Sequence, residues 1–378
     1  MEPSTPSPTL HIRSGELLAL RLFDIAYAVD LARAAELWSV QAGRESRRSR
    51  LVTAAPKALA FVVPPLQLDL GSTSIDIDGV AVSARLSARL YDFGVVALAA
   101  RVGVAELDWA QFAERFDALD RVIGAKASSA FWTDQLERIR SVVLPALERP
   151  TVDAVEEDYL IGIVHTPAEP LSAAQLRERI DIPALLAGES RPLSEGARRE
   201  LMQRSYSYYA DDLVVLAWDR AFVYEPRGDS DVADIIEMAN AQLVEFRYYD
   251  ELLDAELPRM YDRVEVARRT ASLFASRRVA QLAHKLYTLV AEVTELTEKI
   301  DNALQVTEDV YLARIYSGAL ELFRVPNVSA AVDRKLAIIR DTYTALYDEA
   351  SDSRAELLEI AIIVLITIEI ALALIALR

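Results

Sequence analysis

The chain has 378 residues, and 58 Asp and Glu against 41 Lys and Arg give it a formal net charge of −17. This charge is a poor match for a polyanion, so we expect no nucleic-acid partner. The chain contains no cysteine, which excludes disulfides, thiolate metal centres and cysteine nucleophiles.

Residues 1–9 contain three prolines and no basic side chain, so we expect a disordered tail rather than a secretory signal. An apolar run at 17–23 predicts a strand, and Asp24 is placed to cap a helix after it. Hydrophobic alternation and turn residues then predict strands near 58–63, 66–70, 80–91, 95–102 and 158–165, with helices near 107–119 and 126–147.

The head domain extends to residue 228. Prolines punctuate a region of short helices between 167 and 192, and strand-like sequence returns at 206–209 and 213–224. We expect these last strands to join the first sheet. The sequence therefore predicts an α+β head over residues 10–228, in which a mixed sheet is combined with helices.

Residues 229–356 form the predicted long-helix coiled-coil region. The first helix runs from about Asp231 toward Arg269, with Pro258 inside it. Two further helices carry apolar residues at alternating spacings of three and four, which is a heptad seam. A short connection at 325–327 favours an antiparallel hairpin. Two readings stay open, because a bundle core within one chain and an oligomeric coiled coil use the same seam residues: Val279, Leu282, Leu286, Leu289, Val293, Leu296 and Ile300, then Val332, Leu336, Ile339, Tyr343, Leu346 and Ala350.

Residues 357–378 are the most apolar part of the chain, and from Leu357 to Leu377 a helix would be about 31 Å long. This length matches the hydrocarbon core of a bilayer and predicts a single transmembrane tail anchor. The body would then face the cytoplasm at a bacterial inner membrane. Glu369 lies within the segment, where a carboxylate is costly unless paired or protonated. It is either a contact to another protein or a tolerated carboxylic acid; burial of this helix inside the protein is the competing reading.

We find no motif for catalysis, metal binding or cofactor binding, since the three histidines lie far apart and the glycines are scattered singly. We therefore expect no catalytic residues, no metal and no cofactor. The most distinctive polar stretch is 245–254. Within it, Arg247, Tyr248, Asp250 and Asp254 form a candidate interaction patch. Asp250 and Asp254 share one helical face and could in principle hold a cation, but a solvated face is the better explanation, because a cation site built from helices needs further carboxylates or His from a neighbour.

Three stretches of the chain resemble the domain-of-unknown-function family that contains the required-for-meiotic-nuclear-division proteins. They are Tyr91-Asp92-Phe93-Gly94-Val95-Val96, Arg334-Lys335-Leu336 and the block from Arg354 to Ile370. The family's Pro-Asp-Phe-aromatic stretch is replaced here by Phe323-Arg324-Val325-Pro326. The resemblance implies a membrane-anchored protein, linked in one eukaryotic member to organelle translation, and it brings no catalytic residues.

These observations predict a tail-anchored scaffold or tether whose head binds a protein partner or a second copy of the chain. The competing class is a regulator or enzyme that binds a small ligand between the head and the long helices. Such a site would use the strand from Trp218 to Tyr224 and the helix around Tyr248, Tyr249 and Asp250.

Overall fold

The computed structural model describes residues 10–41, 46–48, 59–61, 63–125, 127, 130–151, 155–189, 191–228, 231–269, 275–302, 304–306 and 310–376. The chain divides into two compact units. The head unit comprises residues 1–248 and 299–326, and the helical unit comprises 249–298 and 327–378. The head therefore includes the first half of a long helix and a later helix that the predicted domain boundaries assign to the coiled-coil region.

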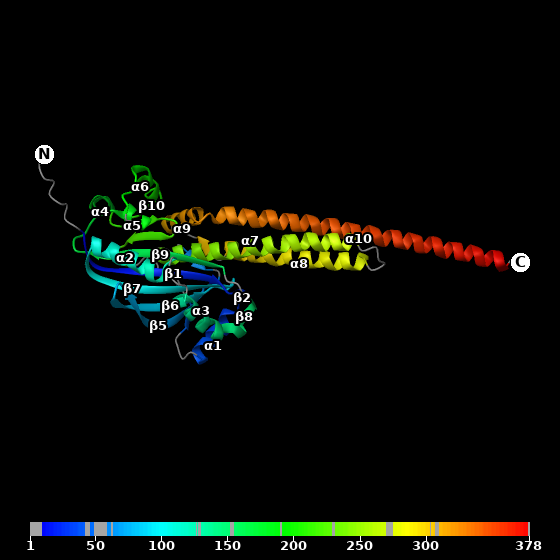
Figure 1. The fold of residues 1–378 in the computed structure, drawn as a ribbon, viewed down its shortest axis with the longest axis horizontal. Coiled ribbons are helices and arrows are strands. Elements are labelled where there is room, and N and C mark those ends of the chain that lie inside the picture. The colour runs from blue at the N-terminus through cyan, green and yellow to red at the C-terminus, as the bar shows by residue number, and fades with distance from the viewer. Residues whose placement is uncertain are drawn as a thin grey trace. The chain divides into compact units, whose positions relative to one another are not determined.

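The head is built on a sheet of nine described strands in the order β10-β11-β12-β9-β1-β7-β6-β5-β3 (Figure 1). All neighbours are antiparallel except β12 and β9, which are parallel. The central strand β1 is a long apolar run, which suits a strand covered on both faces. The strands are β1 (His11–Asp24), β3 (Ser46–Arg48), β5 (Leu66–Ile77), β6 (Val80–Leu90), β7 (Val95–Asp108), β9 (Glu156–Pro167), β10 (Ser205–Tyr206), β11 (Leu213–Leu216) and β12 (Arg220–Tyr224).

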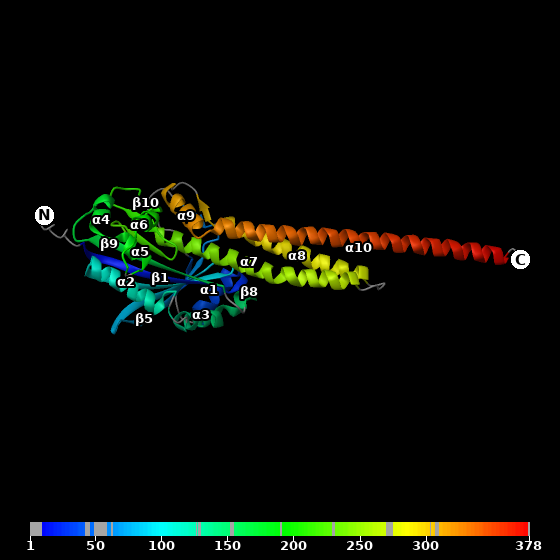
Figure 2. The same cartoon turned by 45° about the horizontal axis from the view of Figure 1, so that its top comes forward.

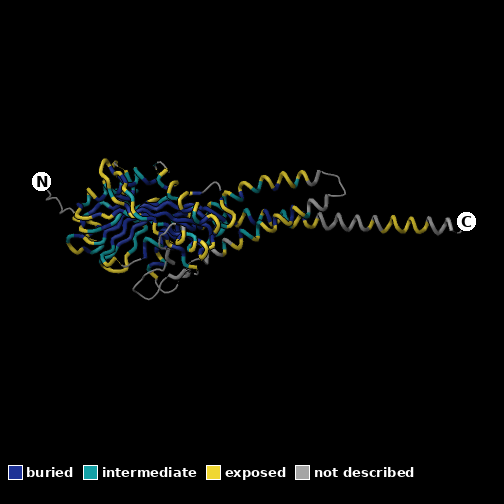
Figure 3. The backbone as a smooth tube through the Cα atoms, turned by 90° about the horizontal axis from the view of Figure 1, so that it is seen from below, coloured by how far each residue is buried: buried dark blue, intermediate teal, exposed yellow. Residues whose placement is uncertain are grey.

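Helices cover both faces of this sheet. Side chains alternate between the faces along a strand, and Ala88 and Leu90 of β6 lie in the core cluster that also contains Phe112 and Phe116 of α2 (Trp109–Ile123). Arg89, which lies between them, reaches the other face and pairs with α7 (Val232–Arg269). Figure 3 shows that the buried residues of the head are concentrated in the sheet. The remaining helices that precede α7 are α1 (Leu31–Gln41), α3 (Ala130–Val143), α4 (Ala173–Arg179), α5 (Ile182–Ala187) and α6 (Glu195–Leu201).

One edge of the sheet is covered by α9 (Val310–Leu322), which lies beside β10 in Figures 1 and 2. Tyr206 of β10 packs on Gly318 of α9, because a Cβ atom at Gly318 would lie 1.8 Å from the Tyr206 hydroxyl. Phe323, just after α9, is buried with its ring centroid 5.4 Å from that of Tyr159. The head thus gains a helix that begins 86 residues after the end of β12, from 224 to 310.

At the carboxyl end of β1, the structure contradicts the prediction that Asp24 caps the following helix. Asp30, not Asp24, caps α1, because its Oδ1 atom accepts hydrogen bonds from the amides of Ala32 and Arg33, at 3.0 Å each. A short strand, β2 (Ala26–Val29), intervenes and pairs with β8 (Leu147–Pro150). Asp24 itself is fully buried. Its carboxyl group lies near Gly94, where φ is +99° and where any Cβ atom would collide with the carbonyl oxygen of Ala26.

The helical unit contains the second half of α7, most of α8 (Ala275–Asn302) and α10 (Val325–Ala376) from Asn327 onward. Three long helices are present, and α7 spans almost the predicted range. The predicted short connection at 325–327 is wrong, because a strand at 304–306 and the helix α9 lie between α8 and α10, and α10 itself begins at Val325. The seam residues Leu282, Leu286, Val293, Val332, Leu336, Ile339 and Leu346 are buried within the single chain. This burial agrees with the bundle-core reading, whereas Leu289 and Tyr343 of the same seams are only half-buried, so the oligomeric coiled coil stays a prediction. The other short pairing that the structure describes joins β4 (Leu59–Phe61) to β13 (Leu304–Val306) in the head unit.

The predicted transmembrane anchor at 357–378 is contradicted: among the described residues, no helix is long and apolar enough to cross a membrane. Within that segment, side chains are described for Glu359 and for residues 362–370, and all of them are exposed. The other side chains of the segment lie outside the described residues. The predictions of a lipid bilayer as partner and of a single-pass membrane localisation depended on this anchor, and they are contradicted with it.

Candidate functional site

Exposed aromatic side chains gather at the sheet edge that α9 covers. Tyr208, Tyr209 and Trp218 are 64%, 45% and 54% exposed, which is unusual for rings of this size in one region. Each belongs to a turn that flanks β11. We define the aromatic–arginine surface as these three residues with the neighbouring Tyr206, Tyr311, Arg227, Arg314 and Arg324.

The first end of this surface lies at the start of β11. Asp212 holds the turn, because its carboxylate accepts hydrogen bonds from the amides of Tyr208 and Tyr209, at 2.7 and 3.1 Å. The Tyr208 ring contacts the rings of Tyr209 and Tyr311, with centroids 4.8 and 5.6 Å apart. The guanidinium of Arg227 lies 4.1 Å from the centroid of Tyr209. Three tyrosines and one arginine therefore form a continuous contact.

The second end lies at the turn between β11 and β12. There the guanidinium of Arg324 lies 5.7 Å from the ring centroid of Trp218. Arg324 follows the C-terminus of α9 with φ at +58°, a left-handed conformation that normally favours glycine at this position. The fold thus keeps a large cationic side chain where a glycine would be less strained, and sparsely populated conformations of this kind cluster at functional positions.

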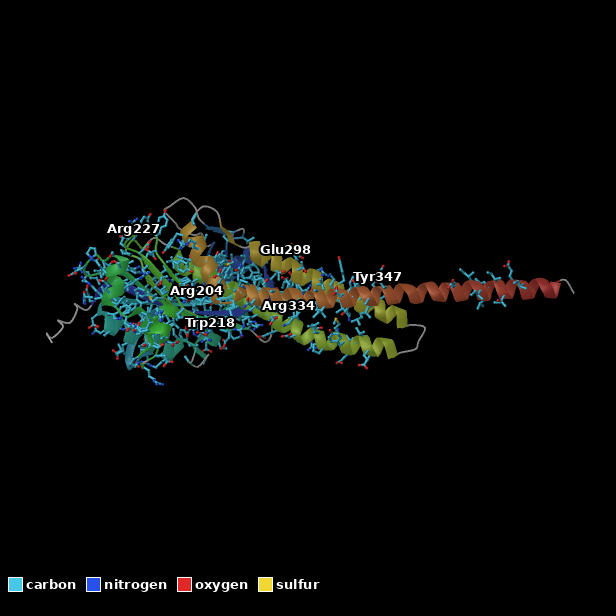
Figure 4. The ribbon with its side chains drawn as sticks, turned by 90° about the horizontal axis from the view of Figure 1, so that it is seen from above. Arg204, Trp218, Arg227, Glu298, Arg334 and Tyr347 are labelled. Atoms are coloured by element: carbon cyan, nitrogen blue, oxygen red, sulfur yellow. The ribbon has the colours of Figure 1, made fainter. Side chains whose placement is uncertain are left out.

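Arg204, just before β10, forms hydrogen bonds to α9. Its Nη1 atom donates to the carbonyl of Gly318 and to the carboxylate of Glu321, both at 3.2 Å. Figure 4 shows Arg204 and Trp218 near one another and Arg227 further along the head. The strand register agrees with this order, because Tyr206 of β10 pairs with Val214, near the start of β11, and Ser205 pairs with Val215. The surface therefore extends along α9 from Tyr311 to Arg324.

The predicted interaction patch separates into two intramolecular sets. Arg247 forms an ion pair with Glu157 in the head. Tyr248 is half-buried; burial, and then the charges of Asp24 and Glu245, raise its pKa to about 12. In the helical unit, Lys335 Nζ lies 2.6 Å from a carboxylate oxygen of Asp250 and 2.6 Å from one of Asp254. An ammonium group thus occupies the place where a cation was considered, and the described residues form no metal-type cluster.

Glu369 lies in the exposed run 362–370 of α10, whose Ile, Leu and Val side chains are about half exposed. Contiguous exposed apolar surface marks a place where other molecules associate. The structure gives Glu369 no described partner, so its role as a contact residue stays a prediction.

Sequence reasoning did not identify Glu237, and it did not recognise Asp24 as a buried carboxyl group. Glu237 of α7 accepts a hydrogen bond from the Tyr91 hydroxyl at 2.9 Å and lies 3.1 Å from Arg89 Nη1. Burial raises the pKa of Glu237, although Arg89 opposes this. Burial also raises the pKa of Asp24, to about 8, against weaker opposing effects of Thr151, Ala26 and Arg140. Perturbed acids often mark active sites, but Asp24 is 0% and Glu237 3% exposed, so both are inaccessible to a substrate in this conformation.

The comparisons with known proteins bear on the head. A family model described as "Uncharacterized protein MJ0711, N-terminal domain" matches residues 14–231, which is more than half of the chain. The chain belongs to this family. A relative from Methanocaldococcus jannaschii, uncharacterized protein MJ0711, is 25% identical over 239 residues, covering 63% of this chain and 72% of the relative. No solved structure matches.

Membership of the MJ0711 N-terminal domain family thus covers the sheet and the aromatic side of the surface, including Tyr208 and Trp218. Tyr311, Arg314 and Arg324 lie outside the matched range. None of the comparisons refers to meiotic nuclear division proteins, so that resemblance rests on the sequence stretches alone.

Proposed function

We propose that this protein is a scaffold whose head binds a protein partner through the aromatic–arginine surface. The single observation that carries the proposal is the contact series of exposed Tyr208, Tyr209 and Trp218 with arginine guanidinium groups. Tyr, Trp and Arg are the residues most enriched at the energetic centres of protein interfaces. They present a large rigid area at low cost in side-chain entropy.

The helical unit supports a scaffold rather than a lone binding module. α10 has 52 residues, or roughly 80 Å of helix, and its exposed run 362–370 offers a second place for association. The resemblance to the meiotic nuclear division family agrees with this proposal, because that resemblance brings no catalytic residues. The competing regulator or enzyme reading has weaker support, since Asp24 and Glu237, two carboxyl groups of the head with raised pKa values, are buried in its core.

The proposal predicts that a double variant, Tyr208→Ser with Trp218→Ser, loses its partner. Both side chains are exposed, so the fold is retained and circular dichroism should be unchanged. Because truncating one aromatic hot spot costs about 2 kcal/mol, recovery of a bound partner after crosslinking in cells should fall at least about tenfold. Quantitative mass spectrometry of affinity-purified complexes measures this.

The matched control is Val40→Ser. It removes an apolar side chain of α1 that is 86% exposed and does not belong to the aromatic–arginine surface. Its partner recovery should equal that of the wild type. An identical set of partners at identical recovery in all three proteins would reject the aromatic–arginine surface as the binding site.

A further inference from the structure

The three arginines of the aromatic–arginine surface have an unusual electrostatic setting. Arg227, Arg314 and Arg324 are exposed, and their guanidinium groups lie 4.1, 6.0 and 5.7 Å from the ring centroids of Tyr209, Tyr206 and Trp218. Among the residues that the structure describes, none of the three has a carboxylate within ion-pair distance. Arg204 beside them differs, because it pairs with Glu321.

This setting is not what the composition favours. Acidic residues outnumber basic ones by 58 to 41, and many other arginines of the head, such as Arg89, Arg198 and Arg220, are paired with carboxylates. Stacking on an aromatic ring orients a guanidinium while leaving its N–H groups free to donate. Such groups recognise carboxylates in a bidentate, planar geometry.

We propose that the aromatic–arginine surface binds an acidic segment of a partner protein, whose Asp and Glu carboxylates pair with Arg227, Arg314 and Arg324. This deepens, and rests on, the function proposed above. Tyr208 and Trp218 contact apolar or aromatic side chains between the acidic residues. The α9 helix separates the two ends of the surface by about 20 Å, which an extended segment of about six residues spans.

A single-stranded nucleic acid is the other ligand that could combine negative charge with stacking on aromatic rings. The net charge of −17 disfavours it, because a continuous phosphate backbone would be repelled by the rest of the chain. A short acidic peptide instead needs positive charge only where it binds. The observations therefore favour a protein segment.

The test uses the full chain and a fluorescein-labelled peptide with glutamate pairs near both ends and tyrosine and leucine between them. A second labelled peptide, used for comparison, has glutamine in place of every glutamate. Fluorescence anisotropy should show binding of the glutamate peptide and at least tenfold weaker binding of the glutamine peptide. Binding should weaken further as salt rises, since exposed charges are screened.

The triple variant Arg227→Gln, Arg314→Gln, Arg324→Gln should bind the glutamate peptide at least about tenfold more weakly. The control Arg33→Gln, Arg121→Gln, Arg259→Gln removes the same charge from exposed arginines that pair with Glu36, Asp78 and Glu256. It should bind like the wild type. Replacing the three surface arginines with lysine should give an intermediate loss, because the charge stays and the planar fork is lost.

Three results would overturn the acidic-segment proposal: equal binding of the two peptides, equal loss in the two glutamine triple variants, or surface-dependent binding of a poly-uridine oligonucleotide in preference to the peptide. If these occur while the Tyr208→Ser, Trp218→Ser variant still loses its cellular partner, the proposed scaffold function stands and only the partner chemistry is wrong. If that variant keeps its partner, the scaffold function itself fails.

Discussion

Replacing Asp24 with asparagine is expected to remove most of the pH dependence of the head unit's stability and to stabilise it in alkaline solution. Asp24 is fully buried, no described residue donates a hydrogen bond to its carboxylate oxygens, and the Thr151 hydroxyl donates to its backbone carbonyl at 3.1 Å. Burial therefore disfavours the ionised form and raises the pKa from 3.8 to about 8.

The direction of the effect follows from the two pKa values. Between about pH 4 and pH 8 the folded head keeps this proton while the unfolded chain has lost it. The free energy of unfolding consequently falls as pH rises through that range, by up to about 1.4 kcal/mol per unit, and levels off above pH 8. Full linkage would reach roughly 6 kcal/mol. A buried amide without a partner costs about 1–3 kcal/mol, so we expect a net stabilisation of roughly 3–5 kcal/mol at pH 9.

Other charged groups near Asp24 set the context for this measurement. Arg140 of α3 favours the ionised carboxylate, whereas Tyr248 of α7 is disfavoured from ionising by the Asp24 charge, along with Glu245. The guanidinium of Arg149 partly offsets that effect on Tyr248. None of these groups replaces the missing hydrogen bonds of the Asp24 oxygens.

Urea unfolding followed by tryptophan fluorescence at pH 5, 7 and 9 measures the effect. All four tryptophans (Trp38, Trp109, Trp132 and Trp218) lie in the head unit, so the signal reports on that unit. The control Asp30→Asn removes an exposed carboxylate but keeps a good cap for α1, and its pH profile should match the wild type. A wild-type stability that is flat from pH 5 to pH 9 would refute this account of Asp24.

Arg89→Met is expected to destabilise the head by roughly 3–5 kcal/mol, the usual cost of leaving a buried charge without its partner. Arg89 contacts Asp234 at 3.0 Å and Glu237 at 3.1 Å, and together they attach the start of α7 to the sheet. Without the guanidinium, Glu237 must be ionised in the core or take up a proton. The loss should therefore be larger at pH 8 than at pH 5.

Adding Glu237→Gln to Arg89→Met should restore much of the stability, because the amide oxygen still accepts the Tyr91 hydroxyl and the fully buried carboxylate is removed, although the part-exposed Asp234 keeps its charge. The control is Arg101→Met, which breaks the part-exposed pair with Glu16 in the same sheet and should cost about 1 kcal/mol or less. Equal losses in Arg89→Met and Arg101→Met would show that the buried network contributes no more than a surface ion pair.

Periodic apolar patterns predicted the regular elements of this protein well. The helix from about Asp231 to Arg269 and the strand around 80–91 follow from spacing alone, and the structure places them within a few residues. The strand predicted at 95–102 begins as expected but continues to Asp108. The Ala-Trp-Asp turn at 217–219 was missed, since the run 213–224 is apolar on both sides of it. Asp24 was misassigned as a cap because an acid before an apolar run has the same local pattern whether it caps a helix or ends a buried strand.

The aromatic–arginine surface could not be predicted, because it joins residues 206–227 to residues 311–324 across the sheet edge. Sequence reasoning noted Trp218 only as part of a ligand strand, and it placed 310–322 in the long-helix coiled-coil region rather than in the head. Exposed tyrosines in a turn carry no periodic signal. The left-handed backbone conformation of Arg324 is visible only in its dihedral angles. The C-terminal anchor was the opposite case, in which hydrophobicity alone carried the prediction and the described helices contradict it.

The central claim is that the aromatic–arginine surface is where a protein partner binds, and site-specific photocrosslinking tests it most directly. A photoreactive amino acid placed at Trp218 should crosslink in cells to one protein, within an Asp- and Glu-rich peptide identified by mass spectrometry. The same amino acid at Val40, which is more exposed, should give no such product. Equal crosslinking from both positions, or none from Trp218, would contradict the account.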